Sequence, residues 1–123
     1  MERMKTDYFI LKTVEVTKAG QIVQFETKMP GDAKTLVGYQ ISATKSHDTK
    51  ALAIVGISFN GARQNTINQE LFNRNPANIR RRATALSQNM PLLPNAYTKG
   101  FVEDLNVAAV PYTVKFYFKL STN

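Results

Sequence analysis

The side chains of this sequence that could perform acid–base or nucleophilic chemistry are few, and their spacing is unsuitable. The single histidine, His47, is followed directly by Asp48, and an adjacent aspartate cannot easily orient the same imidazole ring as a catalytic triad requires. Glu103 and Asp104 are also neighbours, so on a strand they would point to opposite faces and could not act as an acid–base pair. We therefore expect no catalytic residue.

The sequence also lacks the residue patterns that bind metals and cofactors. It contains no cysteine and one histidine, which leaves no ligand set with the spacing of a zinc site. Its glycines form neither a phosphate-binding loop nor a dinucleotide fingerprint. We expect a protein that is not an enzyme, with no metal, no cofactor and no small-molecule substrate.

One cluster of charge stands out, formed by Arg80, Arg81 and Arg82. On a helix three consecutive side chains spread over about 200°, so at least one arginine would face away from any single partner. The cluster could contact the phosphates of a nucleic acid, with an affinity that depends on salt and not on base sequence. We favour the other interpretation, in which the arginines form a solvated helix surface or pair with carboxylates of a neighbouring subunit.

The chain is basic, with a net charge of +7 from 16 Lys and Arg against 9 Asp and Glu. Such a balance favours polyanions or an acidic protein surface as partners. Most of the lysines are scattered singly, as expected of lysines that protect exposed strand edges from aggregation. Net charge therefore keeps nucleic acid among the candidate partners without selecting it.

Length and composition are those of one globular domain. The 123 residues, 43% hydrophobic and 20% charged, suffice for a core without disulfides, so we assign a single domain over residues 1–123. No apolar run approaches the roughly 18 residues that span a bilayer. The first apolar run ends at Lys12, too early for a signal peptide. We expect no membrane span and a cytoplasmic location.

The strongest structural signal lies in residues 112–120. Apolar side chains occupy every second position, and Thr113, Lys115, Tyr117 and Lys119 occupy the positions between them. This alternation predicts a β-strand with one buried face and one wet face. Such a strand needs hydrogen-bonded neighbours and a second layer to cover its apolar side chains.

Other strands are expected along the chain. Residues 8–29 predict a hairpin in which Val16 pairs with Val23 across a turn at Ala19 and Gly20. Three further strands are expected at residues 35–43, 51–59 and 101–107. A total of about six to eight short strands predicts an all-β fold, an antiparallel β-sandwich or a jelly-roll-like barrel.

Residues 62–96 differ from the rest of the chain because they are rich in asparagine, glutamine and arginine. Thr66 and Gln69 have the spacing of a capping box, which predicts a short helix up to Phe72. Asn75 and Pro76 are typical of the start of a second helix. Because 35 residues are too long for a structureless loop in a compact domain, we predict a partly helical insertion or arm.

The composition of this insertion is typical of a subunit interface. Amide and guanidinium groups can form many hydrogen bonds without burying apolar surface, and a few apolar residues can serve as anchors. The predicted interface residues are Arg63, Gln64, Asn68, Phe72, Arg74, Leu92 and Leu93.

A polar arm on a small sandwich without cysteine resembles the small structural proteins of bacteriophage virions. The residues that carry the resemblance are 57–61 (Ile-Ser-Phe-Asn-Gly), 68–71 (Asn-Gln-Glu-Leu) and the closing strand 112–120. The resemblance covers architecture and includes no diagnostic motif, so no residue role is carried over. It implies a capsid-associated penton, decoration or spike-base subunit. Such a subunit is made in the host cytoplasm and assembles with other structural proteins in the virion.

The sequence therefore predicts a non-enzymatic structural subunit that forms a homo-oligomer. The alternative is a nucleic-acid-binding protein that uses Arg80, Arg81 and Arg82 together with the scattered lysines. A carbohydrate-binding sandwich is the third hypothesis. It is disfavoured because tryptophan is absent and no exposed aromatic platform is evident in the sequence.

Overall fold

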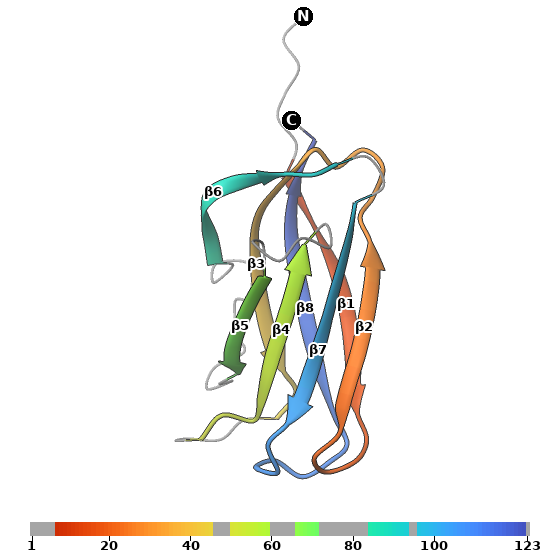
Figure 1. Cartoon of the computed structure of the whole chain (residues 1–123), viewed down its shortest axis with the longest axis vertical. Coiled ribbons are helices and arrows are strands. Elements are labelled where there is room, and N and C mark those ends of the chain that lie inside the picture. The colour runs from red at the N-terminus through yellow and green to blue at the C-terminus, as the bar shows by residue number, and fades with distance from the viewer. Residues whose placement is uncertain (1–6, 46–49, 60–65, 72–83, 94–95, 123) are drawn as a thin grey trace, which may run out of the picture.

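The computed structural model describes residues 7–45, 50–59, 66–71, 84–93 and 96–122, and eight strands account for most of them (Figure 1). The strands are β1 (Asp7–Val16), β2 (Ile22–Lys28), β3 (Thr35–Ala43), β4 (Ala53–Phe59), β5 (Thr66–Leu71), β6 (Thr84–Pro91), β7 (Tyr97–Asp104) and β8 (Tyr112–Ser121). They form two antiparallel sheets that pack face to face, which confirms the prediction of an all-β sandwich.

The strands are paired in a nested order. Sheet A has the order β1-β8-β3-β6 and sheet B the order β2-β7-β4-β5. The first strand pairs with the last, the second with the seventh, the third with the sixth, and the fourth with the fifth. The chain therefore changes sheet at every connection except the one between β4 and β5.

Strand β8 lies in the interior of sheet A, between β1 and β3. Its alternation is confirmed, because the side chains of one parity are buried from Tyr112 to Leu120. Two of them make aromatic contacts across the sandwich. The ring of Phe116 lies 4.6 Å from that of Phe25 in β2, and the ring of Phe118 lies 6.0 Å from that of Phe59 in β4, centroid to centroid. The core is therefore built on this strand.

The predicted hairpin over residues 8–29 is wrong. β1 pairs along its whole length with β8, and β2 pairs with β7 in the other sheet. The turn itself exists, since the side-chain oxygen of Gln21 accepts hydrogen bonds from the backbone N–H groups of Thr17 (2.9 Å) and Lys18 (3.2 Å). It carries the chain from one sheet to the other instead of joining paired neighbours.

The predicted helices in residues 62–96 are wrong wherever the structure describes them. Residues 66–71 form β5, which pairs with β4, and residues 84–91 form β6, which pairs with β3. Leu71 is 2% exposed, so β5 contributes to the core. The rest of the second predicted helix, up to residue 83, lies outside the described residues. In its described parts the segment supplies a strand to each sheet.

In the part of the chain that the structure describes, no helix is long and apolar enough to cross a membrane.

Candidate binding site on the outer face of sheet B

One row of side chains crosses all four strands of sheet B. Gly56 in β4 lies opposite Asn68 in β5 on one side and opposite Phe101 in β7 on the other, and Phe101 in turn lies opposite Gln24 in β2. The three side chains point away from sheet A, because the positions next to them, such as Val55 and Val102, are buried in the core. Residues from four separate parts of the sequence thus form a continuous surface.

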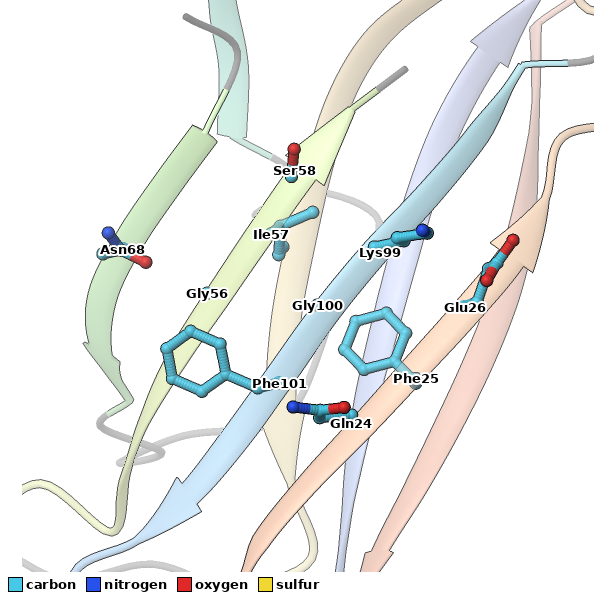
Figure 2. Close-up of a pocket in the computed structure, with 10 residues that line it drawn as sticks. All are labelled: Gln24, Phe25, Glu26, Gly56, Ile57, Ser58, Asn68, Lys99, Gly100 and Phe101. Atoms are coloured by element: carbon cyan, nitrogen blue, oxygen red, sulfur yellow. The ribbon is translucent and has the colours of Figure 1, made fainter. Parts of the chain in front are cut away.

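Phe101 occupies the space that Gly56 leaves empty. A Cβ atom at residue 56 would overlap the ring of Phe101 and would lie 2.7 Å from the side-chain oxygen of Asn68. Figure 2 shows the ring lying across β4 at Gly56 with its broad face toward the viewer. Phe101 does not pack against the hydrophobic core, so one face of its ring rests on the sheet and the other faces outward.

A second glycine–aromatic pair lies in the next row and points the other way. Gly100 in β7 is the direct partner of Phe25 in β2, whose ring packs inward against Phe116. A Cβ atom at residue 100 would lie 2.5 Å from Cζ of Phe25 and would overlap the carbonyl oxygen of Gly56. Pairing an aromatic side chain with a glycine on the adjacent strand covers backbone that would otherwise be exposed.

The row borders a shallow, open groove of about 600 Å³. Its floor is the backbone at Gly56 and Gly100, and its walls come from all four strands (Figure 2). Glu26 and Lys99 are cross-strand partners at one end of the groove, and the Lys99 ammonium lies 5.3 Å from the centre of the Tyr97 ring. That distance permits a cation–π interaction.

The row on the other side of Phe101 combines apolar and acidic side chains. Ile54 in β4 lies opposite Glu70 and Glu103, and Ile22 in β2 lies opposite Glu103. Ile22 is 59% exposed. The groove is therefore bordered by two carboxylates on this side and by one carboxylate and one ammonium group on the other.

The predicted orientation of Glu103 and Asp104 is confirmed, since Glu103 faces outward and Asp104 is 4% exposed. The Asp104 carboxylate accepts hydrogen bonds from the Tyr112 hydroxyl (2.5 Å) and from the backbone N–H groups of Gly20 (2.8 Å) and Asn106 (3.2 Å). Burial on its own raises the pKa of Asp104, but these three hydrogen bonds outweigh it, so the pKa is below its usual value. The carboxylate joins the β1–β2 turn to the ends of β7 and β8.

The predicted interface residues that the structure describes lie in two places. Asn68 is exposed in the groove of sheet B. Leu92 is half-buried against the core, and Leu93 is 65% exposed beside a small hollow of about 200 Å³. The remaining predicted interface residues, Arg63, Gln64, Phe72 and Arg74, lie outside the described residues.

The predicted arginine cluster, Arg80 to Arg82, also lies outside the described residues, and so does His47. Every arginine of the chain lies outside the described residues, so the basic side chains on the described surface are lysines. Among the residues that the structure describes, no three side chains of the metal-binding types come together.

Sequence reasoning missed Gln24, Gly56 and Phe101 as parts of a site. Their only signal was the glycine inside the apolar run 51–59, which indicates a close approach of backbone or ligand.

Comparisons of the chain with protein-family models, with curated proteins and with solved structures give no match. The structure itself places the protein in the class of all-β, two-sheet sandwiches, with a groove on one outer face.

Proposed function

We propose that this protein is a non-enzymatic structural subunit of a larger homo-oligomeric assembly, of the capsid-associated type, and that its sandwich is a jelly roll. The eight strands in two four-stranded sheets support the fold assignment, because a jelly roll has eight strands in two sheets. Jelly rolls recur in viral capsid domains and in lectins. Since a fold does not specify a function, the role in assembly depends on the surface.

The observation that carries the proposal is the origin of the strands on one side of the sandwich. β5 and β6 are the edge strands of sheet B and sheet A on the same side, and both come from the amide- and arginine-rich residues 62–96 (Figure 1). Among the described residues, each pairs with only one strand. An edge strand offers backbone N–H and C=O groups that can pair with another chain.

An exposed apolar side chain follows directly after β6. The backbone N–H of Leu92 donates a hydrogen bond to the carbonyl of Lys34 (2.9 Å), and the carbonyl of Leu93 accepts one from the N–H of Ala96 (3.0 Å). These bonds fix the chain so that Leu92 packs against the core while Leu93 is exposed. Leu93 is therefore suited to act as an apolar anchor in a subunit contact.

The test is the size of the purified protein, measured by light scattering and electron microscopy, with Leu93→Asp as the disrupting variant. We expect a wild-type oligomer that Leu93→Asp shifts to smaller species, because a buried unpaired charge is costly in an interface. Leu11→Asp is the matched control, since Leu11 is 52% exposed in β1, an edge strand on the opposite side of sheet A. A monomeric wild type at every soluble concentration would refute the assembly role.

The nucleic-acid alternative depends on Arg80, Arg81 and Arg82 and makes a different prediction. Binding through phosphates must weaken steeply as salt rises, because bound counterions are released. Titration of DNA and RNA at two salt concentrations therefore distinguishes it from a protein-only assembly.

A further inference from the structure

We infer that the row formed by Asn68, Gly56, Phe101 and Gln24 binds a neutral oligosaccharide, with the ring of Phe101 as the platform for one pyranose unit. The inference does not depend on the assembly role, because Gln24, Gly56 and Phe101 lie in β2, β4 and β7, away from the edge formed by β5 and β6. Only Asn68 lies in the edge strand β5, where it also lines the groove. The proposed role of the groove is to bind the sugar, without any catalytic step.

The first requirement of such a site is a flat apolar surface that faces solvent. Binding sites for small ligands combine apolar and aromatic walls with a few placed polar groups. The Phe101 ring lies flat on the backbone at Gly56 and is not part of the core, so its outer face is open to the groove (Figure 2). The C–H face of a pyranose is apolar and of similar size, so it can lie against this ring.

The second requirement is a set of polar groups at the rim that can hold hydroxyls. Gln24 and Asn68 lie on opposite sides of the Phe101 row position, in β2 and β5, and both line the groove. A carboxamide offers two donors and an acceptor, which matches neighbouring hydroxyls that each donate and accept. Neither side chain makes a hydrogen bond to another described residue that a ligand would have to displace.

The charges around the row favour an uncharged ligand. Glu70 and Glu103 border it on one side, and Glu26 borders it on the other. The nearby cation, Lys99, lies opposite Glu26 and against the ring of Tyr97. The two charged residues that line the groove, Glu26 and Lys99, have opposite signs, and the two in the adjacent row are both carboxylates. A phosphate or carboxylate placed here would therefore have three carboxylates and one ammonium group around it, so a nucleotide is a poor occupant although its base could stack on Phe101.

The experiment is a ¹H–¹⁵N titration of the full chain with neutral oligosaccharides of glucose, mannose and galactose, and with a sialylated oligosaccharide and AMP as anionic probes. We expect at least one neutral sugar to shift the side-chain amides of Gln24 and Asn68 and the backbone signals of Gly56, Gly100 and Phe101. Absence of any such shift, or shifts with the anionic probes only, would overturn the inference.

Three variants locate the contact. Gln24→Ala and Asn68→Ala should each raise the Kd about fivefold, the value of one neutral hydrogen bond. Phe101→Leu still covers Gly56 but removes the flat ring, and it should raise the Kd about tenfold. Gln40→Ala is the control, because Gln40 carries the same carboxamide in sheet A. Equal losses in Gln40→Ala would refute the assignment.

Light scattering of the same samples separates this inference from the assembly role. An oligomer in which the sugars shift no signal would overturn the glycan site and leave the assembly proposal intact. A monomer in which the sugars shift the expected signals would support the glycan site and overturn the assembly proposal.

Discussion

The hydroxyl of Tyr112 is the group whose removal should show most clearly how the end of the sandwich is held together. It donates to the buried carboxylate of Asp104, which also accepts from the N–H groups of Gly20 and Asn106. The hydroxyl is 2.5 Å from the carboxylate, and both residues are almost fully buried. Tyr112→Phe deletes this one donor and preserves the ring in the core.

The expected cost follows from the charge and burial of the acceptor. A hydrogen bond to a charged group contributes roughly 1.5–3 kcal/mol to stability, and more is lost when the remaining partner stays buried. We therefore expect Tyr112→Phe to lower the free energy of unfolding by about 2 kcal/mol or more. With a urea m-value of about 2 kcal/mol/M, the unfolding midpoint should fall by about 1 M.

A second tyrosine supplies a matched control in the same urea experiment. The hydroxyl of Tyr8 donates to Asp32 (2.8 Å), but this pair is exposed to solvent. Because water can replace the lost partner there, Tyr8→Phe should cost no more than about 0.5 kcal/mol. Equal costs for the two variants, or a changed m-value in place of a changed midpoint, would refute the reasoning.

The remaining predictions concern packing and pH, and urea unfolding measures all of them. Gly100→Ala should cost at least about 2 kcal/mol because its Cβ overlaps the backbone of β4, whereas Gly31→Ala, with nothing within 4 Å, should change stability by less than about 0.5 kcal/mol. Phe116→Ala should cost about 3–5 kcal/mol by leaving a cavity, while Leu11→Ala at the surface should be nearly neutral. Folding lowers the pKa of Asp104, so the stabilisation from its carboxylate is present above the unfolded pKa of about 3.9 and is lost as pH falls through the folded pKa. Asp104→Asn should therefore weaken the loss of stability as pH falls below about 4.

Each of these predictions has an outcome that would contradict it. A loss in Gly100→Ala as small as that in Gly31→Ala would mean that β7 and β4 are farther apart than described. A small loss in Phe116→Ala would place the ring outside the core. An unchanged pH dependence in Asp104→Asn would mean that another carboxylate controls acid unfolding.

The strand over residues 112–120 was predictable because its signal is local. A strand at a sandwich interior has one face in the core, and that geometry imposes alternation on consecutive residues whatever the partner strands are. Tyr112 and Phe116 could therefore be assigned to the core from the sequence. The same reasoning correctly indicated an all-β sandwich.

Strand pairing was not predictable, because it depends on residues far apart in the chain. The faces of β1 and β2 have the same alternation whether they pair with each other or with β8 and β7. A turn at Gly20 suggested the first arrangement. The structure has the second, in which the N–H of Gly20 donates to Asp104, 84 residues away in the sequence.

The helix predicted from Thr66 failed for a related reason. A capping-box spacing describes local preference only, and pairing with β4 over residues 66–71 overrides it. The groove on sheet B could not be predicted from the sequence either. Gln24, Gly56, Asn68 and Phe101 become neighbours only through three strand pairings that no local pattern reveals.

The nested pairing has a consequence for synthesis on the ribosome. Because β8 separates β1 from β3, sheet A has no continuous hydrogen bonding until the last strand has been translated. Until then β1 has no strand partner, and the apolar side chains of β4 have no complete opposite layer. A nascent chain of this kind exposes aggregation-prone strands for most of its translation, so chaperone binding before release should determine its yield in the cell.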